Sequence, residues 1–252
     1  MPRKPRNNLT SKFYHIMTQG INREYIFNDD DSIIYYRELM HLKREKLNIN
    51  ILAYCIMNNH VHILVNTDAV SDMSKYMQKI NSSYSNYYNK INRRVGYVFR
   101  DRYLSEEILN ERQLFNCIKY IHFNPVKAKM VLKPQNYKYS SYNEFLGKKY
   151  LITEQSISLL FGKCNNYKKE FQELHKTRID EEENFVDIKD IEIQEFIKKL
   201  EKININIKDI KNDKKLTKRI IKMARTETNV TVRELADILG ISKSKVSKLD
   251  NN

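Results

Sequence analysis

The sequence contains few of the residues that build covalent or extracellular scaffolds. Its 252 residues include only three cysteines, at positions 55, 117 and 164, far apart and in no C-x-x-C pattern. This spacing excludes a disulfide framework and a cysteine zinc site, and it indicates a reducing, cytoplasmic location. Five glycines and four prolines exclude a collagen-like chain. No apolar run approaches the roughly 18 residues that a membrane helix needs, so we expect no membrane contact.

Acidic residues are too few to balance the basic ones. The 45 Lys and Arg against 31 Asp and Glu give a formal net charge of +14. Residues 1–150 carry 24 basic and 13 acidic side chains and residues 212–252 carry 10 and 5, whereas residues 151–211 carry 11 and 13. Two basic regions around a neutral middle are expected if both ends bind a polyanion. A compositional bias toward Lys, Asn and Ile would produce the same excess.

Hydrophobic periodicity predicts an α+β fold for the first 150 residues. Alternation of side chains, or short apolar runs, predict strands at 12–19, 49–57, 60–65 and 97–108. The two central strands are joined by Asn58-Asn59, where we expect a tight hairpin with positive φ angles.

Apolar residues spaced by three and four predict the helices of this region, at about 29–47, 71–91 and 111–123. Asp29 to Asp31 offer an N-cap for the first, and Pro125 is expected to end the third at Asn124. The order β-α-β-β-α-β-α predicts a ferredoxin-like, mainly antiparallel sheet with helices.

An all-α region is expected after residue 150. We divide the chain into a domain at 1–150, a helical linker region at 151–212, with a solvated segment at 180–185 and a helix at 188–211, and a third unit at 213–252. In the last unit Ala236, Gly240 and Val246 have the spacing of a helix-turn-helix, with Thr231 and Ser242 as helix caps. Lys243 and Lys248 on the second helix would then face duplex DNA.

Two histidines form the first candidate site. His60 and His62 alternate on a strand, so both rings project from one face, and neutral imidazoles at this spacing can bind a divalent ion that needs one further ligand. Most H-x-H pairs are incidental. The other histidines, His15, His41, His122 and His175, are interpreted as structural.

Tyr120 and Asn124 form the second candidate. They are four residues apart on a predicted helix and therefore share a face. A phenol can attack phosphorus if a metal polarises the phosphate, and an amide oxygen can complete the metal site. The alternative is that Tyr120 is a packing residue and Asn124 ends the helix before Pro125.

Four separated strings resemble HUH-type single-tyrosine transposases, in particular the REP-associated tyrosine transposases. They are YHIMTQGINREYIF (14–27), LAYCIMNNHVHILV (52–65), YSNYYNKINRRVGYVFRDRY (84–103) and KYIHFNPVKAKMV (119–131), followed by YKYSSYNEFLG (137–147). The resemblance covers about residues 3–150 in unbroken order. It implies a ferredoxin-like sheet, a divalent metal (Mg²⁺ or Mn²⁺) and cleavage of single-stranded, hairpin-forming DNA through a 5′-phosphotyrosine.

The family's functional residues match positions of this sequence one by one. Its H-U-H histidines match His60 and His62, its nucleophilic tyrosine matches Tyr120, and its third ligand matches Asn124. Two positions depart from the family pattern: Asn58 replaces a usual proline, and Gln19 replaces an arginine before Gly20, which could remove a DNA contact.

Arginines interleaved with aromatic residues suggest the surface that binds the single strand, namely Arg93, Arg94, Arg100 and Arg102. The sequence therefore predicts a DNA nicking and strand-transfer enzyme, monomeric or homodimeric, with a C-terminal unit that binds duplex DNA. A catalytically silent DNA-binding regulator is the main alternative. A metal-dependent hydrolase of small phosphoesters is a third, although it gives no reason for the positive charge.

Overall fold

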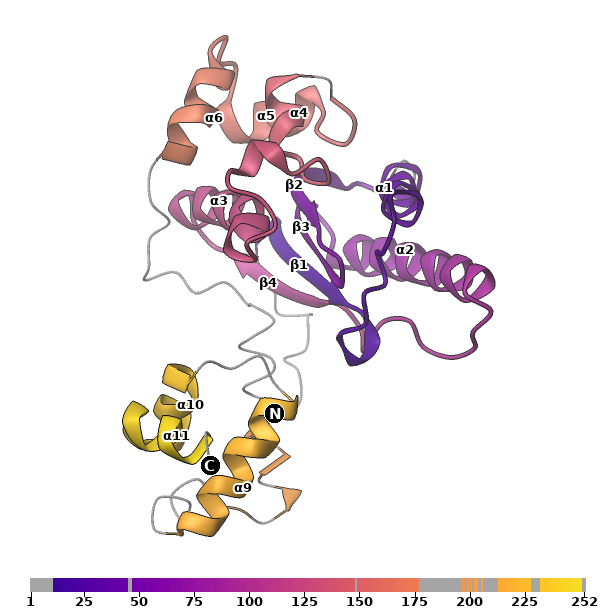
Figure 1. The fold of residues 1–252 in the computed structure, drawn as a ribbon. Helices are drawn as coiled ribbons and strands as arrows, with labels where there is room; N and C mark the ends of the chain where they lie inside the picture. Colours follow the sequence, from indigo (N-terminus) through magenta and orange to yellow (C-terminus); the bar gives the residue numbers. More distant parts are fainter. Residues whose placement is uncertain are drawn as a thin grey trace. The chain divides into compact units, whose positions relative to one another are not determined.

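The computed structural model describes two compact units, Met1–Phe185 and Val186–Asn252. Within them it describes residues 11–44, 47–147, 149–176, 196–197, 199–200, 202–203, 205, 213–227 and 232–250 (Figure 1). We call these the N-terminal unit and the C-terminal unit and treat each by itself. Over the described ranges, no helix combines the length and apolar character needed to cross a membrane.

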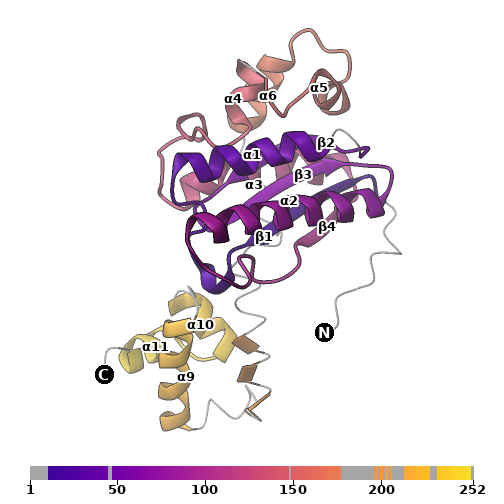
Figure 2. The same cartoon turned by 90° about the vertical axis from the view of Figure 1, so that its right-hand side faces the viewer.

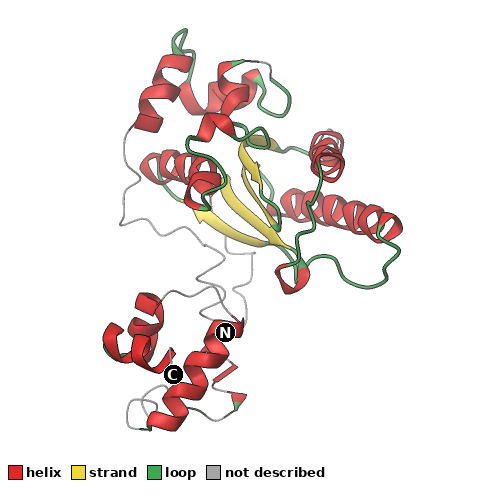
Figure 3. Ribbon diagram, viewed as in Figure 1, coloured by secondary structure: helices red, strands yellow, loops and turns green. Residues whose placement is uncertain are grey.

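A four-stranded sheet forms the centre of the N-terminal unit (Figure 3). Its strands are β1 (Phe13–Gln19), β2 (Asn50–Ile56), β3 (His60–Asn66) and β4 (Leu104–Ile108), in the order β2-β3-β1-β4. Every neighbouring pair is antiparallel. The predicted strand at 97–108 is wrong in its first half: only Phe99 forms an isolated bridge, to Gly20, before β4 begins.

Helices cover both faces of this sheet. α1 (Asp30–Arg44) and α2 (Val70–Ile91) lie together on one face, and α3 (Glu111–Lys127) lies on the other (Figures 1 and 2). The order β-α-β-β-α-β with this strand arrangement is the ferredoxin-like layout. The predicted α+β fold is confirmed, and the third helix occupies the face that α1 and α2 leave open.

α1 and α2, on the face of the sheet opposite α3, form where apolar residues recur every three or four positions. Asp29 caps α1, because its Oδ1 accepts a hydrogen bond from the Ser32 amide at 2.7 Å. The side chains that α1 and α2 bury recur at three and four residues, which places them on one stripe toward the sheet: Ile33, Tyr36, Leu39, Met40, Met73, Tyr76, Met77, Ile80 and Tyr84. Two short 3-10 helices, η2 (Ile21–Arg23) and η3 (Pro134–Asn136), lie in connections.

The hairpin between β2 and β3 closes differently from our expectation. Neither Asn58 nor Asn59 has a positive φ; the turn is closed by a hydrogen bond from the Met57 amide to the His60 carbonyl at 2.8 Å. The carbonyls of Asn58 and Asn59 instead accept bonds from the amides of Phe27 and Gly20. An added Cβ at Gly20 would lie 2.6 Å from the Glu24 carbonyl, so this close approach requires glycine.

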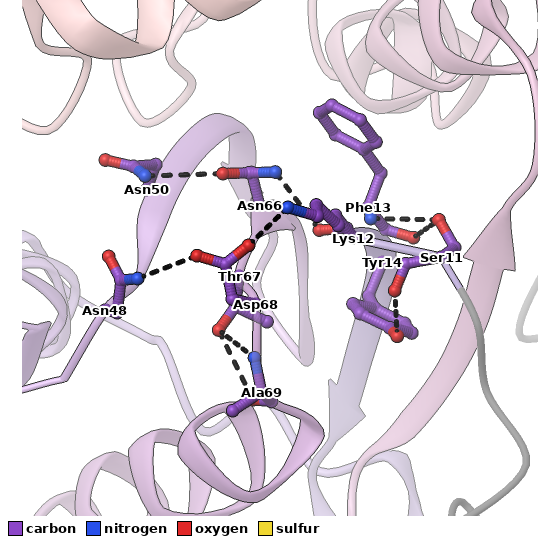
Figure 4. A network of polar contacts seen from close by, with 10 residues as sticks. All are labelled: Ser11, Lys12, Phe13, Tyr14, Asn48, Asn50, Asn66, Thr67, Asp68 and Ala69. Carbon is purple, nitrogen blue, oxygen red and sulfur yellow. Dashed lines mark hydrogen bonds and ion pairs between the residues drawn. The ribbon is translucent and has the colours of Figure 1, made fainter.

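A polar network fixes the opposite end of β1 and β3 (Figure 4). Lys12 forms an ion pair with Asp68 at 2.7 Å, and the Asn48 amide donates to the same carboxylate at 3.1 Å. The Asn66 side chain donates to the Lys12 carbonyl at 3.3 Å. These bonds support the register in which Phe13 faces Asn66, and with it the pairing of Met17 with His62.

α3 continues through Pro125, so the prediction that it ends at Asn124 is wrong. A proline inside a helix removes one amide donor, but here the last turn still closes through a bond from the Ala128 amide to the Asn124 carbonyl at 2.9 Å. Pro125 is buried, and its packing accompanies the retained helix. Asn124 is therefore a helical residue and does not end α3.

Three short helices complete the N-terminal unit: α4 (Tyr142–Leu146), α5 (Glu154–Phe161) and α6 (Tyr167–Lys176). Phe145 and Phe171 stack with ring centroids 4.3 Å apart, and Leu151, Ile152 and Leu160 join the same core. Residues 151–176 thus belong to the N-terminal unit and not to the linker region that the sequence predicts. The solvated segment at 180–185 and most of the helix at 188–211 lie outside the described residues.

The C-terminal unit contains α9 (Lys214–Glu227), α10 (Val232–Leu239) and α11 (Lys243–Asp250). Their apolar faces form a separate core that includes Ile220, Leu235, Ala236, Leu239 and Val246. Gly240 has φ +57°, as the predicted turn requires, and the Ser242 hydroxyl accepts from the Lys245 amide at 3.2 Å, capping α11. The predicted cap Thr231 lies outside the described residues.

Candidate active site

His60 and His62 project from β3 toward α3. Their ring centroids are 4.9 Å apart with perpendicular planes, and the His62 ring meets the Tyr120 ring of α3 edge-on at 5.4 Å. His62 is completely buried and His60 nearly so. Since side chains alternate along a strand, Val61, Ile63 and Val65 face α1 and α2, and the two imidazoles share the α3 side.

Hydrogen bonding leaves the outer nitrogen of each histidine available. His60 Nδ1 lies 2.6 Å from Asn59 Oδ1, an oxygen that only accepts, so Nδ1 donates and Nε2 keeps its lone pair. His62 Nδ1 contacts His15 Nε2 at 3.0 Å. Among the described residues the buried His62 Nε2 has no hydrogen-bond partner.

Burial also fixes the charge of both rings. It lowers the pKa of His60 to about 3. Burial, followed by the neighbouring His60, holds the pKa of His62 well below its ordinary value. Both imidazoles are therefore neutral at neutral pH, which is the state that binds a metal ion.

Tyr120 lies on α3 at the centre of this group. Its side chain is buried, with ring-to-ring contacts to His62 and, at 5.7 Å, to His15. Lys127, two helical turns further along α3, places its Nζ 4.5 Å from the Tyr120 ring centroid. A cation at this distance over an aromatic ring favours negative charge on it. Sequence reasoning missed Lys127, although a spacing of seven residues on a helix indicates a shared face.

Asn124 follows Tyr120 by one turn, as predicted. Its Nδ2 donates to the Tyr120 carbonyl at 3.0 Å, which leaves Oδ1 as the free acceptor of the amide. The structure thus brings His60, His62 and Tyr120 together by direct ring contacts, and it ties Asn124 to the helix that carries the tyrosine.

The chemical types of these donor groups suit a divalent ion. Two neutral imidazoles and an amide oxygen are ligands that Mn²⁺ and related ions accept. In the portion of the chain that is described, no three His, Cys, Asp or Glu side chains are grouped to hold a metal. An ion at His60 and His62 would therefore depend on the Asn124 amide and on oxygens of the substrate.

The four predicted arginines have different surroundings. Arg94 forms an ion pair with Glu24 at 2.6 Å, and Arg100 donates to the Gln19 side chain at 3.3 Å. Arg93 and Arg102 are exposed. Because Gln19 pairs with His60 across β1 and β3, Arg100 lies at the end of the sheet that carries the candidate site.

A groove runs beside this end of the sheet. It has a volume of about 830 Å³ and lies between α2 and residues 96–103. Polar side chains of α2 such as Gln78, Asn81 and Ser85 line one wall, and Arg100 and Arg102 line the other. Tyr97, on the same wall, is 84% exposed.

His122 and His175 form a separate buried pair, consistent with a structural role. His122 Nδ1 lies 2.8 Å from His175 Nε2, and its Nε2 lies 2.7 Å from the Ser141 hydroxyl. These bonds join α6 and the start of α4 to α3, on the helix that carries Tyr120.

Comparison with known proteins identifies the class. Residues 8–124 match the family described as IS200-like transposases, which confirms the resemblance found in the sequence. The matched segment includes all four candidate residues, His60, His62, Tyr120 and Asn124.

Among the solved structures similar to this chain is a REP-associated tyrosine transposase bound to a REP hairpin. The TM-score is 0.51 at 15% sequence identity, and the match covers 59% of this chain and 87% of the other. At this identity the likeness establishes the fold. No curated protein matches the sequence.

Proposed function

We propose that this chain is a transposase-like enzyme that nicks single-stranded DNA and transfers the strand, with Tyr120 as its nucleophile. The observation that carries the proposal is the Tyr120 ring lying edge-on to His62 at 5.4 Å, inside the segment that matches the IS200-like family. A phenol with its usual pKa near 10 attacks phosphorus poorly by itself, so the neighbouring groups must assist it.

The proposed step forms one bond to phosphorus and breaks another. The Tyr120 oxygen attacks the phosphorus, the bond from phosphorus to the 3′ oxygen breaks, and that oxygen takes the proton and becomes a 3′-hydroxyl. The 5′ phosphate stays on Tyr120 until a second 3′-hydroxyl attacks it and restores the tyrosine. A divalent ion, Mg²⁺ or Mn²⁺, held by His60, His62 and the Asn124 amide oxygen would polarise the scissile phosphate.

The remaining residues orient the reactants. Burial in the contact between α3 and the sheet limits the rotamers of Tyr120, and the Lys127 ammonium favours negative charge on its ring. The groove beside α2 offers Arg100 and Arg102 for phosphates and the exposed Tyr97 for stacking of unpaired bases. The hairpin in the similar transposase structure supports a hairpin-forming strand as substrate.

We infer that the C-terminal unit binds duplex DNA. On α11, Lys243 and Lys248 are exposed while Val246 and Leu249 are buried against α9 and α10, so the basic face is open to a groove of DNA. Duplex binding by this unit would help to choose the site that the N-terminal unit cuts.

The test is a covalent adduct. The full chain is incubated with Mn²⁺ and a hairpin-bearing single strand from the DNA that flanks its gene, labelled at the 3′ end. We expect a labelled protein band on a denaturing gel, its loss in Tyr120→Phe, and its retention in the matched control Tyr87→Phe. Mass spectrometry of the adduct should identify Tyr120.

Other results separate the alternatives. Binding without cleavage in the parent protein would indicate a silent regulator. Cleavage without an adduct, unchanged in Tyr120→Phe, would indicate water as the nucleophile and a hydrolase.

A further inference from the structure

Three side chains from three adjacent strands form a line that ends at the candidate metal site. His15 of β1 stacks on His62 of β3, with ring centroids 5.1 Å apart and planes 16° from parallel. His15 Nε2 lies 3.0 Å from His62 Nδ1, and His15 Nδ1 lies 3.9 Å from a carboxylate oxygen of Glu106 on β4. Glu106 is directly opposite His15 in the register of β1 and β4.

The carboxylate decides which way the protons point. A negative charge 3.9 Å from His15 Nδ1 attracts an N–H and repels a lone pair, so Nδ1 carries the proton and Nε2 is the acceptor. His62 Nδ1 must then donate across the 3.0 Å contact. A neutral His62 with its proton on Nδ1 has its lone pair on Nε2, the nitrogen that has no partner among the described residues.

The opposite arrangement is less favourable at both ends. If His15 donated to His62, its Nδ1 lone pair would face Glu106. His62 would then carry a proton on Nε2, a buried donor without an acceptor, and it would offer no ligand. Glu106 at 3.9 Å is too distant for a direct hydrogen bond, so it acts through its charge.

We propose that His15 and Glu106 are positioning residues that hold His62 in the Nδ1-protonated tautomer, with Nε2 directed at a divalent cation. The part that concerns the cation rests on the proposed function; the tautomer does not. Metal-binding histidines commonly donate their second nitrogen to an outer partner, and loss of that partner weakens metal binding about 10-fold to 100-fold.

The first experiment uses metal-free, DNA-free protein. Long-range ¹H–¹⁵N correlation spectra of ¹⁵N-histidine-labelled full chain report which ring nitrogen carries the proton. We expect His62 to be protonated on Nδ1 in the parent and to lose this preference in His15→Phe, which has no acceptor. His15→Gln supplies an amide oxygen and should retain it. A parent His62 protonated on Nε2 would overturn the proposal and would leave the Tyr120 adduct test unaffected.

The second experiment measures Mn²⁺ affinity by titration calorimetry and electron paramagnetic resonance, without DNA. We expect His15→Phe to weaken binding about 10-fold to 100-fold, Glu106→Gln to weaken it a few-fold, and His15→Gln to stay near the parent. Glu107→Gln is the matched control, because Glu107 neighbours Glu106 but bonds the Ser11 amide instead.

The set of variants still tests the proposal if one of them does not fold. If His15→Phe does not fold, Glu106→Gln decides the question, since Glu106 is partly exposed at the edge strand. The proposal is wrong if Glu106→Gln, His15→Gln and any folded His15→Phe all keep the parent's Mn²⁺ affinity and the parent's His62 tautomer. That result would show that His15 and Glu106 only fill space.

Discussion

Acidification from pH 7.5 to pH 5.0 should destabilise the N-terminal unit through His175. Burial lowers the pKa of this residue to about 4, against about 6.5 for an exposed histidine. The hydrogen bonds explain why the neutral form is required. His175 Nδ1 donates to the Phe171 carbonyl at 2.8 Å, so its Nε2 must accept from His122. Protonation of His175 would therefore require His122 to give up the proton on its Nδ1.

The magnitude follows from the two pKa values. Between pH 6.5 and pH 4 the unfolded chain binds the proton and the folded chain does not, so stability is complete above 6.5 and falls as the pH falls. At pH 5.0 the loss is about 2 kcal/mol, and it approaches about 3 kcal/mol below pH 4. The neighbouring His122, whose pKa burial also lowers, adds to the same trend.

The assay is urea unfolding followed by circular dichroism at both pH values, in the parent and in His175→Gln. The variant should be less stable at pH 7.5, because an amide replaces a packed ring, but its stability should change less with pH by about 2 kcal/mol. Equal pH dependence in the two proteins would refute the argument, as would a parent that is more stable at pH 5.0.

Further predictions concern the reaction and the two basic regions. His62→Ala, or EDTA added to the parent, should slow nicking about 100-fold or more, and excess Mn²⁺ should restore only the EDTA-treated parent; full activity in chelator would exclude the metal. Lys127→Met should slow adduct formation about tenfold, while Lys127→Arg keeps most of the rate; equal rates would remove Lys127 from the site. The Lys243→Ala, Lys248→Ala double variant should weaken duplex binding and reduce the salt slope by about 0.9 per lost phosphate contact, with nicking of a saturating single strand unchanged. Unchanged duplex affinity would mean that α11 does not bind DNA.

The strands and helices of the first 130 residues could be predicted because their signals are local. Alternation and short apolar runs placed β1, β2 and β3 within one or two residues, and apolar spacing did the same for α2. The prediction that α3 ends at Asn124 was wrong. The rule about residues before proline considers only the backbone, whereas the buried packing of Pro125 keeps α3 helical. The strand prediction for the segment before β4 was wrong because Phe99 and Tyr103 pack into the core without pairing along a strand, and Tyr97 is exposed.

The site shows the same limit. His60, His62, Tyr120 and Asn124 were predicted from short motifs. His15 was not, because its role depends on a register that brings β1 beside β3, a contact between residues 47 apart in sequence. The docking of α6 was missed as well, since nothing near Phe171 or His175 indicates that their partners are Phe145 and His122.

The position of the two halves of the site has a consequence for local opening. His60 and His62 lie on β3, which has a strand on each side, so its amides should exchange with solvent only when the whole sheet unfolds. Tyr120 lies on α3, whose outer side is held by α6 through the His122–His175 contact. Release of α6 would therefore be a sub-global event that loosens the helix carrying Tyr120 and leaves His60 and His62 in place on β3. If Tyr120 is the nucleophile, as proposed, the free energy of that opening would set how often Tyr120 loses its position.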